Sequence, residues 1–101
     1  MNFAFDEKLK EYIKKHNKKT LLVELIQVNN SDFEISELSL RFVDERMRKI
    51  FIEKQRYRVV PTEMCEILLP PFPLEMQETV TFGLKSFLCF NSITCTGIKI
   101  E

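Results

Sequence analysis

The chain has 101 residues, a length typical of one domain, so we predict a single domain over residues 1–101. Apolar residues make up 45% and charged residues 30% of it, which excludes a disordered or fibrous chain. The formal net charge is zero, with 15 basic and 15 acidic side chains. This balance argues against a protein that binds nucleic acid or a membrane through a large overall charge, although local charged surfaces remain open.

Other features of the sequence bear on membrane contact, export and disulfide bonding. The longest nearly uncharged run, residues 67–74, contains three prolines and is far shorter than the roughly 20 residues that span a bilayer. No apolar signal-peptide core follows the first residues. Three cysteines are an odd number, which favours reduced thiols over a disulfide framework. We therefore expect a cytoplasmic protein without membrane contact.

The first two elements have clear signals. Leu9, Tyr12 and Ile13 recur at helical spacing, so the sequence predicts an amphipathic helix over residues 6–16 with Asp6 as its N-cap. Residues 20–28 are apolar on both faces of a strand. A strand of this kind is typical of the middle of a sheet or of a small barrel.

The middle of the chain fits more than one kind of secondary structure. Residues 29–32 predict a turn, and the apolar positions of the next strand change parity near Glu37, which indicates a bulge. Residues 43–51 fit either a helical stripe or a strand of a hairpin that turns at 53–55. We favour one helical turn over residues 44–48 followed by the hairpin.

The pattern of the last part of the chain indicates strands. We predict one strand over residues 64–69, which the prolines of 70–73 end. Clear alternation predicts another over residues 79–84, whereas 85–90 fit either a short helix or its continuation. We expect a turn at Asn91 and Ser92, then a last strand over 93–100 with a bulge at Gly97.

The predicted fold is therefore α+β: an N-terminal helix packed on a small, mainly antiparallel β-sandwich or distorted barrel. One helix is followed by six or seven short strands. Only two glycines are present, and neither G-x-G-x-x-G nor the P-loop pattern occurs, so the sequence gives no support to dinucleotide or P-loop chemistry.

Both ends of the chain resemble a known family. The helix segment 6–15, with the strand segment 21–25, and the closing segment 92–98 resemble the HesB-like A-type iron–sulfur carrier group, nearest its small clostridial CC/Se motif relatives. The resemblance implies a helix that leads into a compact, barrel-like β-sandwich. It also implies a cysteine or selenocysteine pair after the first strand, where this chain has Asn29-Asn30-Ser31, and a C-terminal Cys-x-Cys, which is missing. A competent cluster site is therefore not expected.

The weak metal candidates are Cys65, Cys89 and Cys95. Cys89 and Cys95 flank the predicted turn, so their thiolates would lie on neighbouring strands. A zinc ion or iron–sulfur cluster needs four ligands, and Cys65 and His16 are the only other soft ones in the chain. If a dimer completed the four ligands, the chain would be a residual iron–sulfur or metal carrier, which is one alternative function. The other interpretation is that the cysteines are small buried side chains without a metal.

The arginines form the other candidate site. The charge changes sign in four blocks, and all five arginines fall between residues 41 and 58: Arg41, Arg46, Arg48, Arg56 and Arg58. Arginine suits planar recognition of carboxylate or phosphate, so these residues on one face would bind an anion, an acidic partner or nucleic acid. The alternative is that they pair with the acidic residues Glu24, Asp32, Glu34 and Glu37, within the chain or across a dimer.

We expect a non-enzymatic cytosolic binding or assembly module without a cofactor, acting through a protein partner or a second copy. No nucleophile and base, oxyanion turn or metal set can be assembled from the spacing, so an enzyme is not expected.

Overall fold

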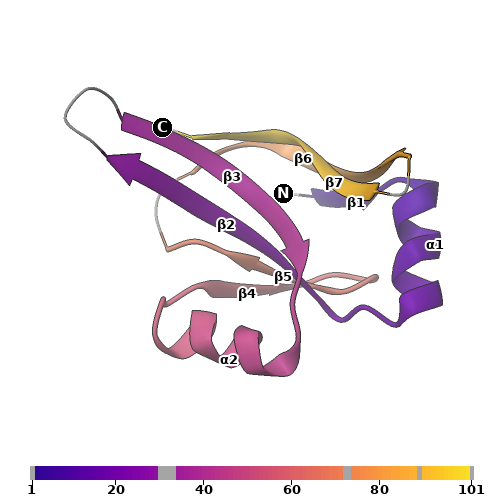
Figure 1. The fold of residues 1–101 in the computed structure, drawn as a ribbon, viewed down its shortest axis with the longest axis horizontal. Helices are drawn as coiled ribbons and strands as arrows, with labels where there is room; N and C mark the ends of the chain where they lie inside the picture. Colours follow the sequence, from indigo (N-terminus) through magenta and orange to yellow (C-terminus); the bar gives the residue numbers. More distant parts are fainter. Residues whose placement is uncertain (1, 30–33, 72–73, 89, 101) are drawn as a thin grey trace.

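The computed structural model describes residues 2–29, 34–71, 74–88 and 90–100 (Figure 1). These residues form two helices and seven strands. In chain order they are β1 (Asn2–Phe5), α1 (Glu7–His16), β2 (Thr20–Asn29), β3 (Glu34–Phe42), α2 (Glu45–Glu53), β4 (Arg58–Pro61), β5 (Glu66–Leu69), β6 (Leu74–Phe87) and β7 (Phe90–Ile100).

The strands form two mixed sheets, so the fold is α+β as predicted. The first sheet has the order β1-β6-β7 and the second β3-β2-β5-β4. The pairs β1–β6 and β2–β5 are parallel, and the other three are antiparallel. In the described ranges the sheets do not join into a closed barrel. They meet where β3 contacts β7 and diverge towards β1 and β4 (Figure 1).

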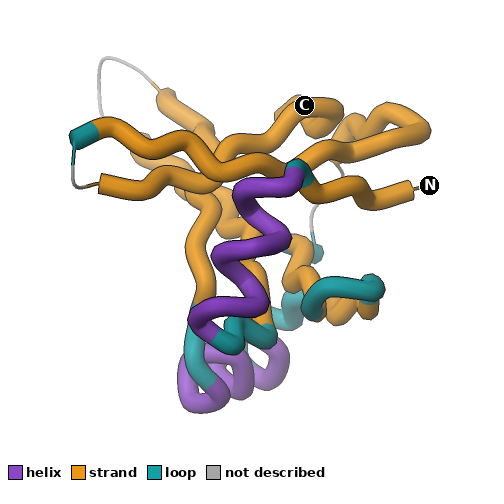
Figure 2. Tube along the Cα trace, turned by 90° about the vertical axis from the view of Figure 1, so that its right-hand side faces the viewer, coloured by secondary structure: helices purple, strands orange, loops and turns teal. Residues whose placement is uncertain are grey.

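The main core lies between the sheets and is closed at one end by α1. Figure 2 shows α1 descending from the end of β1 towards the level of α2. The helix buries Leu9 and Ile13, which agrees with the predicted apolar stripe. The strands supply the other buried members of this core, namely Leu21, Val23, Cys65, Ile67, Leu69, Val80 and Phe82.

Asp6 connects β1, α1 and β6. Its Oδ1 accepts a hydrogen bond from the Leu9 N–H at 2.8 Å, which confirms the predicted N-cap. Its own N–H donates to the Phe82 carbonyl at 2.9 Å, and its Oδ2 accepts from the Leu84 N–H at 3.3 Å. A Cβ on Gly83 would lie 2.6 Å from that Oδ2, so the glycine makes room for the carboxylate.

A second, smaller core lies on the other face of the four-stranded sheet. There α2 places Phe51 against Leu22 and Leu68, and the Tyr57 ring lies edge-on to Phe51 at 5.0 Å between centroids. The Tyr57 hydroxyl accepts a hydrogen bond from the Leu25 N–H at 3.2 Å. Both faces of β2 are thus buried near its start, as the two-sided apolar pattern predicted.

Two predictions for the middle of the chain are wrong. Residues 45–53 form a helix of nine residues with Asp44 as N-cap, rather than one turn and a hairpin. The helical stripe prevails because Phe51 and Met47 pack against the small core beneath α2. The bulge near Glu37 is also absent, since β2 and β3 pair without a register shift from Leu21–Phe42 to Asn29–Glu34.

The C-terminal strands differ from the prediction in length. Residues 85–87 continue β6, and Asn91 and Ser92 lie in β7 rather than in a turn. The chain reverses between Phe87 and Phe90, which pair with each other, and Leu88 adopts a left-handed conformation with φ 56°. The pairing of β6 and β7 is irregular at Gly97, where we expected a bulge, and Gly97 has φ +98°. The additional residues are in β6, however, between Met76 and Thr81. Strand β1 was not predicted.

We expect Phe82→Ala to lower the free energy of unfolding by about 3–5 kcal/mol, because Phe82 is fully buried and its ring stacks with both Phe3 and Phe5. Phe90→Ala is the matched control, since Phe90 is 69% exposed and its change should stay within about 0.5 kcal/mol. Urea unfolding curves measure both. Equal losses in the two variants would contradict the assigned core.

Candidate functional site

The structure places two of the three candidate cysteines in or beside the main core. Cys65 is buried, and Cys95 is half-buried on β7 opposite Phe82. Cys89 lies outside the described residues. Both described thiols are free, and the described part of the chain contains no group of three or more histidine, cysteine or acidic side chains arranged to hold a metal.

Burial also changes the chemistry of these thiols. Desolvation raises the pKa of Cys65 to about 11, with the Glu66 carboxylate adding to the effect. Desolvation alone raises the pKa of Cys95 to about 11. Because the thiolate is the metal ligand and the nucleophile, these two residues have the properties of small core side chains at neutral pH.

The five arginines do not share one face. Arg41 is opposite Leu22 on the outer face of the four-stranded sheet, whereas Arg58 is opposite Leu69, whose side chain points into the main core. They also lie on the two opposite edge strands, β3 and β4. The others are exposed Arg46 on α2, exposed Arg56 after it, and half-buried Arg48.

Two of these arginines already have carboxylate partners. Arg41 Nη1 is 3.0 Å from Glu24 Oε1, one of the pairings that the sequence suggested. Arg48 donates to both oxygens of Glu66, at 2.7 Å and 3.1 Å, and its Nη1 is 3.3 Å from Glu45 Oε1. The bidentate pair ties α2 to β5 and lowers the pKa of Glu66, mainly through the hydrogen bond from Arg48.

His16 is exposed at the last residue of α1. Its ring centroid lies 4.5 Å from that of Tyr12, which in turn stacks with Phe42 at 6.0 Å. No cysteine or carboxylate among the described residues contacts His16 by a hydrogen bond or ion pair. The histidine therefore has a packing partner on its own helix but lacks the surroundings of a catalytic base.

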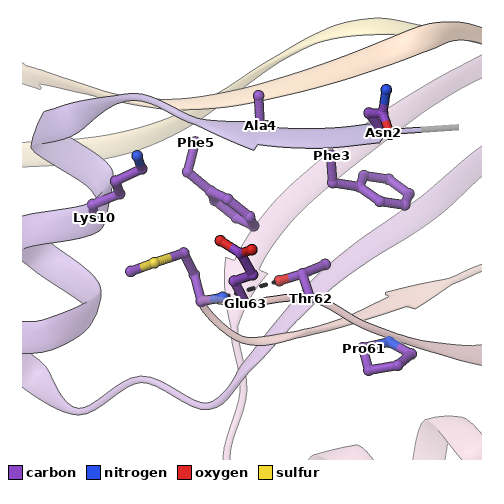
Figure 3. A pocket seen from close by; sticks show the side chains of 9 residues that line it. Asn2, Phe3, Ala4, Phe5, Lys10, Pro61, Thr62 and Glu63 are labelled. Carbon is purple, nitrogen blue, oxygen red and sulfur yellow. Dashed lines mark hydrogen bonds between the residues drawn. The ribbon is translucent and has the colours of Figure 1, made fainter.

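One candidate for binding is a groove at the open side of the two sheets. It has a volume of about 440 Å³ and runs between β1 and residues 61–64, with Lys10 of α1 also lining it. Figure 3 shows the rings of Phe3 and Phe5 pointing from β1 towards this groove, while Asn2 and Ala4 point to the other side. All four residues of β1 line it, so the groove follows the edge of that strand.

Both walls of the groove are held in place. Phe3 and Phe5 stack on the buried Phe82 ring, with centroids 6.1 Å and 5.7 Å away. On the opposite side the Thr62 hydroxyl accepts hydrogen bonds from the N–H groups of Met64, at 3.3 Å, and Cys65, at 3.2 Å. A site whose walls are fixed before binding loses little entropy when a ligand enters.

Sequence reasoning missed this groove. Its walls come from residues 2–5 and 61–64, which lie far apart in the chain and carry no motif. The available signal was the uncharged alternation of Asn2-Phe3-Ala4-Phe5, but four residues are too few to distinguish a strand from an irregular terminus.

Comparisons with known proteins give no assignment. No family model, curated protein or solved structure matches this chain. Within the part of the chain that the structure describes, neither helix has the length and apolar character needed to cross a membrane.

We expect Glu66→Gln to lower the free energy of unfolding at pH 7 by about 1 kcal/mol, because it removes the charged partner of Arg48. The pKa of Glu66 is lowered in the folded state, so the pair stabilises the protein above the ordinary glutamate pKa of 4.5 and ceases to do so as the pH falls through the folded value. Urea unfolding between pH 3 and 7 should therefore show the two proteins converging at low pH. The exposed Glu63→Gln serves as control, and a difference independent of pH would contradict the assignment.

We expect Cys65 and Cys95 to react slowly with iodoacetamide in the folded protein. With a pKa of about 11, roughly one thiol in a thousand is ionised at pH 8, and burial limits access further. Peptide mass spectrometry over a time course should show labelling at least about a hundredfold slower than in urea, where every cysteine is accessible. Rapid labelling of folded Cys65 would exclude the buried, protonated thiol.

Proposed function

We propose that this chain is a non-enzymatic cytosolic binding module that holds a segment of a protein partner in the groove between β1 and residues 61–64. The observation that carries the proposal is the groove itself, which has one aromatic wall, held in place by stacking on Phe82, and opens along a strand edge. Its volume lies in the range of sites that take small ligands or a few residues of peptide.

The chemistry of the groove supports a protein partner over a small charged substrate. Phe3, Phe5 and Met64 supply apolar surface, and Lys10 and Glu63 bring one charge of each sign to the rim. Aromatic residues and methionine are enriched in protein interfaces, and a polar rim around them is usual. A site for a phosphorylated or strongly anionic ligand would need several converging cations, whereas Lys10 is the one cation among the described residues that line this groove.

The proposal includes a distant HesB-like relationship without a competent cluster site. It is supported by the order of helix α1 and strand β2, and by the packing of two sheets on one core. Asn29-Asn30-Ser31 stand where that family carries its paired cysteines. The protonated state of Cys65 and Cys95 also supports a module that acts through contacts rather than through thiol chemistry.

The test starts from a displayed library of random heptapeptides, selected on the folded protein. We expect selected peptides, synthesised with a fluorophore, to bind in anisotropy titrations and to lose about tenfold in affinity with Glu63→Arg, which makes both rim charges positive. Glu75→Arg is the matched control, because Glu75 is an exposed glutamate on β6 that does not line the groove. Failure to select any peptide, or equal binding to both variants, would overturn the assignment of the groove.

A further inference from the structure

We propose that the partner segment binds as an additional β-strand along the free edge of β1, which rests on the proposed function of the same groove. The segment is short and extended, with apolar side chains at alternate positions. Hydrogen bonds to the main chain of Phe3 and Phe5 align the segment with β1, and every second side chain of the segment enters the groove.

The direction of the β1 backbone groups supports this mode of binding. In a parallel pair, alternate residues of a strand direct their N–H and C=O groups to the same neighbour. The Asp6 N–H donates to Phe82, so Ala4 and Asn2 also face β6. The N–H and C=O groups of Phe3 and Phe5 therefore point outward, and the described residues offer them no hydrogen-bond partner.

Among the four strand edges of the two sheets, β1 has the least protection. Strands β3 and β7 contact one another. Strand β4 carries Arg58 and ends in Pro61, and charge and proline are the usual means of preventing edge pairing. The residues of β1 carry no charge, no proline and no bulge. An edge with these properties is a template for a further strand.

The size of the site favours a short segment over a second copy of the whole chain. Strand β1 has four residues, an extended length of about 13 Å. The groove beside it is lined by nine residues, whereas a stable interface takes about 20–30 residues from each partner. A strand of four or five residues fits this edge without requiring a larger contact.

The pleat specifies the chemistry of the segment. A strand added beside β1 points alternate side chains to the same face as Phe3 and Phe5, and that face opens on Met64 and Thr62. These positions take apolar side chains of moderate size. The intervening side chains of the segment lie on the face of Asn2 and Ala4, outside the groove, and need not be apolar.

The experiment uses peptides selected on the groove and tests how they bind. A series with one N-methyl group at each amide in turn should show a period of two. Methylation of an amide that faces β1 should weaken binding at least tenfold, and methylation of the next amide should leave binding within about twofold. In parallel, hydrogen exchange followed by NMR should show the Phe3 and Phe5 amides slowing at least tenfold on binding, while Ala4 changes little.

The outcomes separate this inference from the proposed function. Peptides that bind in a Glu63-dependent manner without the period of two, and without protection of Phe3 and Phe5, would overturn strand addition while leaving a groove that binds protein. Protection of the same amides that rises with protein concentration in the absence of peptide would assign the edge to a second copy and overturn the peptide partner. An absence of selected peptides would remove both proposals.

Discussion

The hydrogen bonds of Asp6 determine how the first helix joins the three-stranded sheet. One carboxylate oxygen caps α1, the other reaches the Leu84 N–H, and the Asp6 N–H binds the Phe82 carbonyl. The side chain therefore fixes the direction in which α1 leaves β1 and the register of β1 on β6. The stacking of Phe3 and Phe5 on Phe82, and with it the wall of the groove, depends on that register.

Local signals were sufficient for elements whose stability is local. The helix of residues 7–16 was predictable from its cap and its apolar spacing, and β2 from a run that is apolar on both faces. Strand β2 packs on the main core with one face and on the small core beneath α2 with the other, which explains why neither face is polar near its start. The α2 segment was misjudged because Ile50 and Ile52 also satisfy a period of two, and only its packing on Leu68 decides in favour of a helix.

The candidate site was less predictable because it depends on distant contacts. The Arg41–Glu24 pair follows from antiparallel neighbours and was among the suggested pairings, but the Arg48–Glu66 pair joins a helix to a strand whose position no motif indicates. The arginines separate because the expected hairpin is a helix, which places Arg46 and Arg48 on α2 and leaves Arg41 and Arg58 on opposite faces of a sheet. Charge blocks along a chain do not specify surfaces until the topology is known.

The parallel pairing of β1 has a consequence during synthesis. Asn2 is opposite Thr79, so β1 is made 77 positions before the strand that pairs with it. At a translation rate of roughly 5–20 residues per second, the uncharged strand waits about 4–15 s without its neighbour. During that interval both edges of β1 are open, although the mature fold leaves only one. In the nascent chain the apolar side chains of β1 are therefore exposed before the groove that they line exists.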